Sequence, residues 1–233
     1  MALRIQFASN LMLPFRSAKH TYKLIKPSAP YLALLGNIGR PECKRTRDFF
    51  KWAAAEFETV YWIPGSLEYS SYKDCPVAWT DASHLLYSFC NEVGGQNVFV
   101  CQKQDLIFPG TDIRVLATPH CFTHSSPMKC YTWELTRGHR EMTREDMMNM
   151  YVAEHIWCKI NLERIEKPTI VLSHTRLNPT LQYTHLLANL YGTNWRDIPN
   201  SVTGCKQPWL GLNMAGHRGF IPDAVLEIEP EKF

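Results

Sequence analysis

The feature that most constrains the fold of this chain is a short apolar segment, residues 169–173, that ends on a single histidine, His174. The segment is rich in β-branched residues and is bounded by Pro168 and by polar residues, which is typical of a buried strand. In an open α/β sheet, functional residues collect where strands end at their carboxyl edge. We therefore expect a buried strand here, with His174 at an edge of the sheet that carries a site.

Other segments predict further strands and helices, and together they indicate the α/β class. Pro41 suits the first turn of a helix, and residues 143–146 match a capping box that opens a longer one. Residues 118–140 look irregular. We see no repeat or linker and expect a single domain over residues 1–233. The predicted strands are 4–8, 31–35, 59–63, 97–101, 112–117, 169–173, 208–212 and 224–228, and the predicted helices are 41–57, 143–164 and 180–190.

Composition sets only broad limits on what this chain does. Hydrophobic residues make up 45% and charged residues 20%, which is ordinary for a globular chain, and a net charge of +3 neither demands nor excludes an anionic partner. No apolar run approaches the roughly 20 residues that span a bilayer, and the first residues do not resemble a signal peptide. The eight cysteines lack paired spacing. We therefore expect an intracellular protein with reduced thiols and no membrane association.

The order of motifs along the chain resembles that of the calcineurin-like metallophosphoesterases. In that family successive strands lead into Asp-x-His, Gly-Asp, Gly-Asn-His-Glu, His and Gly-His-x-His. The resemblance extends over nearly the whole length, and it implies a four-layer α/β/β/α sandwich with two mixed sheets. The segments that carry it are 4–9, 32–36, 63–65, 143–146, 168–174, 213–216 and 220–228.

The chain departs from this family at the positions that would bind metal or protonate a leaving group. Only the histidine of the fourth motif is kept, as His174. The fifth motif aligns with residues 192–195, and an alternative placement at 211–214 also lacks both histidines. In chain order, the eight corresponding positions are Asn10, Met12, Asn37, Ser66, Leu67, His174, Thr193 and Trp195.

The chemistry of the family needs two divalent ions about 3.5–4 Å apart, held by anionic oxygens and imidazoles. Asn37 offers one neutral oxygen in place of the bridging carboxylate, Met12 offers a soft thioether, and Leu67 has no proton to give. The resemblance therefore predicts a pseudoenzyme without metal, cofactor or catalytic residues. Its function would be binding or scaffolding, as for the metallophosphoesterase-like subunit of the retromer coat. A protein partner or self-association is expected.

Two other functions stay open at this point. Asn10, Asn37 and His174 would hold one weakly bound ion in a residual metal-dependent phosphoesterase. A nucleic-acid binder would use the basic residues Arg16, Lys19, His20, Lys23, Lys26, Lys44, Arg45 and Arg47. Loss of ligands from a host enzyme is also expected of copies carried by large DNA viruses, which leaves a viral source open.

Each candidate residue also has an ordinary structural role. A single histidine at a strand end is usually hydrogen-bonded within the fold, and asparagine is common there because it tolerates turn conformations. Charged clusters are usually a solvated surface. The group His120, Cys121, His124 and Cys130 fits no usual zinc spacing, and His217 is expected in a turn, at residues 215–219. Ile156, Trp157 and Trp209 are expected in the core.

Overall fold

The structure is a computed structural model, and only part of the chain is described by it. Backbone and side chains are described for residues 3–15, 24–71, 76–119, 129–134, 138–164, 167–175 and 225–228, and the backbone alone for 186–193 and 209–212.

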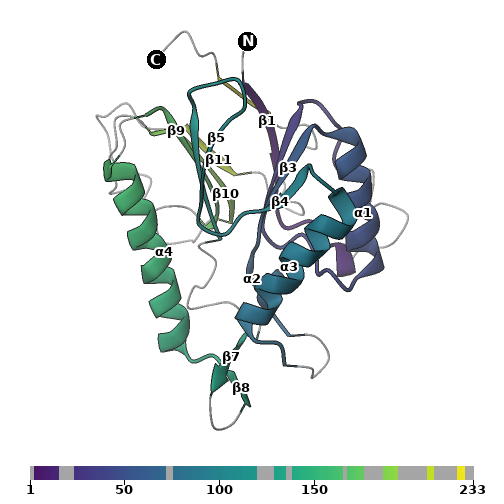
Figure 1. Cartoon of the computed structure of the whole chain (residues 1–233), viewed down its shortest axis with the longest axis vertical. Coiled ribbons are helices and arrows are strands. Elements are labelled where there is room, and N and C mark those ends of the chain that lie inside the picture. Colours follow the sequence, from purple (N-terminus) through teal and green to yellow (C-terminus); the bar gives the residue numbers. More distant parts are fainter. Residues whose placement is uncertain are drawn as a thin grey trace.

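Two five-stranded mixed sheets form the centre of the fold (Figure 1). Each sheet is parallel except for one edge strand: β12 runs antiparallel to β1, and β5 runs antiparallel to β6. The first sheet has the order β12 (Val225–Ile228), β1 (Leu3–Ala8), β2 (Tyr31–Leu35), β3 (Thr59–Ile63), β4 (Val98–Val100). The second has the order β11 (Trp209–Leu212), β10 (Leu186–Thr193), β9 (Thr169–Thr175), β6 (Arg114–Thr118), β5 (Gln104–Ile107).

Helices cover the outer faces of both sheets, so the layers are helix, sheet, sheet and helix (Figure 1). Helices α1 (Lys44–Glu56) and α3 (Trp79–Gly94) pack on the first sheet, and α4 (Arg144–Arg164) packs on the second. The fold of the chain is therefore an α/β sandwich. The shorter elements are η1 (Leu13–Phe15), α2 (Ser66–Tyr69), β7 (Tyr131–Glu134) and β8 (Gly138–Glu141).

The central strands are apolar on both faces because each sheet lies between two layers. Strand β3 shows this clearly: Tyr61 packs into the core between the sheets, whereas Trp62 packs against the helices of the first sheet. The sequence Thr169–Thr175 is buried at every position for the same reason. The two adjacent aromatic residues of β3 therefore enter different layers of the fold.

Most of the predicted elements are present. The eight predicted strands correspond to β1, β2, β3, β4, β6, β9, β11 and β12, with ends that agree to within two residues. Helices α1 and α4 are also confirmed, and α4 begins with the predicted capping box. The Asp146 backbone N–H donates to Thr143 Oγ1 at 3.2 Å, and the Thr143 N–H donates to Asp146 Oδ2 at 2.7 Å.

Two predictions from the sequence are wrong. The predicted helix at 180–190 is a strand over residues 186–190, because β10 pairs in parallel with β9 on one side and β11 on the other; residues 180–185 lie outside the described part. Ile156 is 48% exposed and so lies outside the core, although its neighbour Trp157 packs against the core cluster of α4.

The sequence reading also missed several elements, namely α2, α3, β5 and the β7–β8 hairpin within the segment that looked irregular. No helix within the described residues is long and apolar enough to cross a membrane. That the whole chain forms a single domain stays a prediction.

Candidate site at the strand ends

The loops that follow β1, β2 and β3 meet at the carboxyl edge of the first sheet. These three strands are parallel neighbours, so their ends come together. The Asn10 N–H donates to the Gly36 carbonyl at 2.9 Å, and the Met12 N–H donates to the Asn37 carbonyl at 3.0 Å. Residues of two loops that are distant from each other in the chain are therefore fixed next to each other.

The side chain of Asn37 lies at the centre of this meeting point. Its Nδ2 donates to Asn10 Oδ1 at 2.8 Å, and its Oδ1 accepts from the Leu67 backbone N–H at 2.9 Å. The Ser66 hydroxyl adds a longer contact of 3.4 Å to the same oxygen. The amide therefore cross-links all three loops, with its nitrogen bonded to one loop and its oxygen to another.

The backbone at these positions has an uncommon conformation. Asn10, Met12 and Asn37 have φ angles of 51°, 51° and 55°, in the left-handed region. Asparagine tolerates this region, but most other residues with a Cβ atom, including methionine, adopt it at a cost of roughly 1–2 kcal/mol. The surrounding hydrogen bonds hold Met12 in this conformation, and such strain is concentrated at functional sites in many proteins.

His174 reaches the same place from the second sheet, at the end of β9. Its side chain is buried, and its Nδ1 lies 2.9 Å from the Leu35 carbonyl oxygen. Because a carbonyl only accepts, Nδ1 carries the proton and Nε2 is left as an acceptor. Burial lowers the pKa of His174 to about 4, so the ring is neutral at physiological pH.

Two glycines allow these groups to approach one another. A Cβ at Gly36, where φ is +80°, would lie 2.2 Å from Nδ1 of His174. A Cβ at Gly65 would lie 2.7 Å from Oδ1 of Asn37 and 3.0 Å from Nε2 of His174. Oδ1 of Asn37 and Nε2 of His174 therefore both lie close to the Gly65 backbone, and a larger residue at position 65 would displace them.

Glu68 supports the site by accepting hydrogen bonds from its backbone, and the sequence analysis did not identify this residue. It is 4% exposed, and its carboxylate accepts backbone N–H bonds of 2.7–3.0 Å. Burial raises the pKa of Glu68 to about 7, against the opposing effect of these donors. A signal was available, because Gly65 and Glu68 keep the first and last residues of the Gly-Asn-His-Glu motif. The donors are the backbone N–H groups of Asn37, Ile38, Gly39 and Gly65.

Only some of the remaining predicted residues lie in the part of the chain that the structure describes. Thr193 ends β10, where its backbone pairs with Thr175, the residue after His174. Trp195 lies outside the described residues, as do His120, Cys121, His124, His217 and the basic residues 16–23. Cys130 is buried, and within the described residues no group of three or more His, Cys, Asp and Glu side chains could hold a metal ion.

The basic residues of α1 are engaged within the protein. Lys44 pairs with Asp48 and Arg47 with Glu92, while Arg45 Nη1 donates to the Pro14 carbonyl at 3.3 Å. Pairing with carboxylates reduces the positive field that a phosphate backbone would meet. This helix therefore offers little support for binding nucleic acid.

The residues gathered here do not fit a pair of divalent cations. Hard or borderline cations need anionic oxygens or imidazoles, and such a centre would have to be built from two neutral amides, a thioether and one imidazole. Both polar atoms of the Asn37 side chain are also already bonded to the protein. Leu67 brings a buried hydrocarbon to the position of a proton donor.

The two mixed sheets, with helices on both outer faces and three loops that meet at the strand ends, define an α/β sandwich. Among solved structures, the chain is similar to the crystal structure of a phosphopantetheinyl hydrolase from Mycobacterium tuberculosis. The two share 14% sequence identity with a TM-score of 0.61, over 97% of this chain and 95% of the other. This likeness confirms the fold class that the sequence predicted.

Comparison of the sequence itself gives no further relatives. No protein-family model matches the chain, and no curated protein matches it.

Proposed function

We propose that this chain is a non-catalytic member of the phosphoesterase fold that acts by binding another protein. The observation that carries the proposal is the bonding of Asn37, whose side-chain nitrogen donates to Asn10 and whose oxygen accepts from Leu67. At this position the metallophosphoesterases, which the sequence resembles, have a carboxylate that bridges two ions. Here an amide joins the loops through direct hydrogen bonds, so this position stabilises the fold instead of binding metal ions.

A hydrolysis assay with added metal tests the proposal. The purified chain is incubated with bis(p-nitrophenyl) phosphate and Mn²⁺, Mg²⁺ or Zn²⁺, beside an active metallophosphoesterase as a positive control. We expect no release of nitrophenolate above the rate without protein. Turnover that needs the metal and disappears in His174→Ala would overturn the proposal.

A residual metal-dependent hydrolase is the second candidate, and one observation favours it. The Leu35 carbonyl fixes the tautomer of His174 so that Nε2 is free to bind an ion, which is the arrangement that orients histidine ligands in metal sites. The similar solved structure is also that of a hydrolase. Isothermal titration with Mn²⁺ separates the candidates, because a single-ion site would give saturable binding that is lost in His174→Ala.

A further inference from the structure

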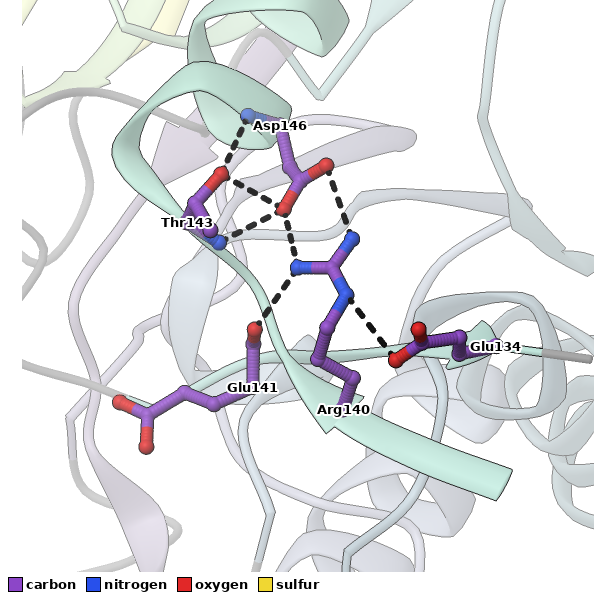
Figure 2. A network of polar contacts seen from close by, with 5 residues as sticks. All are labelled: Glu134, Arg140, Glu141, Thr143 and Asp146. Atoms are coloured by element: carbon purple, nitrogen blue, oxygen red, sulfur yellow. Dashed lines mark hydrogen bonds and ion pairs between the residues drawn. The ribbon is translucent and has the colours of Figure 1, made fainter. Parts of the chain in front are cut away.

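Helix α4 is fixed to its neighbours near both ends. At its start, Arg140 on β8 donates to both carboxylate oxygens of Asp146, at 2.7 and 3.2 Å (Figure 2). Towards its end, the Asn161 carbonyl accepts a bond of 2.6 Å from Arg114, a buried residue of β6. Asp105 on β5 holds the same guanidinium through bonds of 2.7 and 2.8 Å. The helix is therefore a rigid support for the side chains on its outer face.

Apolar side chains occupy both the inner and the outer face of α4. On the inner face, Cys158 and Leu162 pack against the second sheet. On the outer face, Val152, Ile156 and Ile160 are 42%, 48% and 39% exposed. These three residues follow one another at intervals of four, so they are neighbours on the helix surface and form a continuous stripe. A helix with apolar side chains on both faces is usually covered on both.

The stripe differs from the other exposed apolar residues of the chain because its members adjoin one another. Trp133 on β7 is more exposed, at 55%, but its Nε1 donates to Asp81 on α3 at 3.0 Å. Single exposed apolar residues are ordinary, whereas contiguous ones indicate a contact surface. Figure 1 shows α4, in green, as the outermost layer on its side of the part of the chain that the structure describes. The stripe is therefore open to a partner.

The charges around the stripe limit what that partner is. The exposed charged residues of α4 have both signs and are Arg144, Glu145, Lys159, Glu163 and Arg164. Lys159 lies 3.8 Å from Glu163 in the same helix. A polyanion, or a segment that is strongly acidic or strongly basic, would meet like charge as well as opposite charge here. A partner surface of mixed charge fits better, and a second copy of α4 is such a surface.

An antiparallel second copy matches this face of α4 along its length. With the two-fold axis at Ile156, that residue meets its own equivalent, and Val152 meets Ile160 of the second copy. Asn149 and Glu163 lie on the same face at equal distances on either side of Ile156, so they also meet, and the amide then donates to the carboxylate. A parallel copy would instead place Glu163 against Glu163, which is unfavourable.

We propose that the outer stripe of α4 is the interface of an antiparallel dimer of this chain. The helix has 21 residues and is therefore about 30 Å long. One helix pair of this length gives an interface at the small end of specific complexes, so the dimer forms reversibly and depends on concentration. The inference goes beyond the proposed function, which concerns the strand ends, and neither depends on the other.

Sedimentation equilibrium of the intact chain, from about 1 to about 500 μM, tests the dimer. We expect the average mass to rise with concentration from 26.9 kDa, the mass of one chain, towards twice that value. Ile156→Asp places two carboxylates together at the two-fold axis and should weaken the dimer by about tenfold or more. Ile107→Asp on β5 is the matched control, because Ile107 is also 48% exposed, and its affinity should stay within about twofold.

Two outcomes of that experiment would overturn the proposal. One is a mass that stays at that of one chain at the highest concentration, which would leave the stripe to a different protein. The other is a dimer whose affinity is unchanged in Ile156→Asp.

Two substitutions of Asn149, an exposed residue, test the antiparallel direction. Asn149→Lys faces Glu163 of the second copy and should tighten the dimer by about threefold, whereas Asn149→Glu should weaken it by a similar factor. In a parallel dimer each new charge would face its own equivalent, so both variants would weaken association. Weakening by both variants, or no change in either, would therefore contradict the antiparallel dimer.

Discussion

Nδ2 of Asn37 donates a 2.8 Å hydrogen bond to Oδ1 of Asn10, across the ends of two neighbouring parallel strands. Two aspartates at these positions would place negative charges at this distance, with no cation between them. The bond shows how the chain keeps the loops at these strand ends together with neutral groups. Replacing these two amides with carboxylates therefore tests the electrostatic effect of charge at this contact directly.

The double variant Asn10→Asp with Asn37→Asp should make stability depend on pH. Two carboxylates this close share a proton in the folded protein, so their pKa is raised on folding. A raised folded pKa gives stability that is present at low pH and lost as pH rises. We expect the thermal midpoint to fall further below that of the wild type at about pH 8 than at about pH 5.

The control for this variant is Asn10→Asp alone, which keeps an acceptor for Nδ2 of Asn37. Its midpoint should differ from that of the wild type by nearly the same amount at both pH values. An equal deficit at both pH values in the double variant would show that the carboxylates do not face each other.

Replacement of Glu68 should destabilise the whole site. Glu68→Gln turns an amide nitrogen towards backbone N–H groups that now donate to a carboxylate, and leaves buried donors without an acceptor. We expect a loss of about 3 kcal/mol or more in the free energy of unfolding, measured with urea. The matched control is Glu56→Gln on the exposed surface of α1, which should change it by less than about 0.5 kcal/mol. Similar values for both variants would refute a supporting role for Glu68.

The neutral ring of His174 should contribute a pH-dependent part of the stability. Its pKa is lowered to about 4, so the unfolded chain takes up the proton first as pH falls. The contribution is therefore complete above about pH 6.5 and is lost towards pH 4, on the order of 3 kcal/mol in all. His174→Asn, which keeps a donor for the Leu35 carbonyl, should remove this dependence.

The quantity to compare is the difference in unfolding free energy between wild type and His174→Asn across that pH range. The difference removes the contribution of Glu68, whose raised pKa acts in the opposite direction. His84→Asn on the exposed face of α3 is the control and should give a flat difference. A flat difference for His174→Asn as well would mean that its ring is not buried in the neutral form.

Asp146 should fix the hairpin that carries Trp133. The Arg140 guanidinium beside it holds the pKa of Asp146 well below its usual value, and Asp146 also closes the capping box of α4. Since the pair is partly exposed, we expect Asp146→Ala to cost only about 1–2 kcal/mol. Amide hydrogen exchange in β8 should become faster. Glu145→Ala, one residue earlier and exposed, should leave that exchange unchanged.

Local patterns were enough for most of the strands and for the positions at their ends. Apolar runs bounded by Pro168 or by polar residues located β9, and the motif order placed Asn10, Asn37 and His174 at strand ends. The same patterns failed at β10, where a segment with a helical pattern is a strand because it lies between two strands that bond to it. Periodicity describes one segment at a time, whereas pairing in a sheet depends on its neighbours.

The sequence by itself determined which groups reach the site: two amides, one histidine, and hydrocarbon where the family that it resembles has ligands. Only the tertiary structure decided how these groups are bonded. Asn37 finds Leu67 30 residues away, and His174 finds Leu35 139 residues away, through the register of the sheets and the space left by Gly36 and Gly65. Side-chain chemistry is a property of each residue, but hydrogen-bond partners are set by which strand ends are brought together.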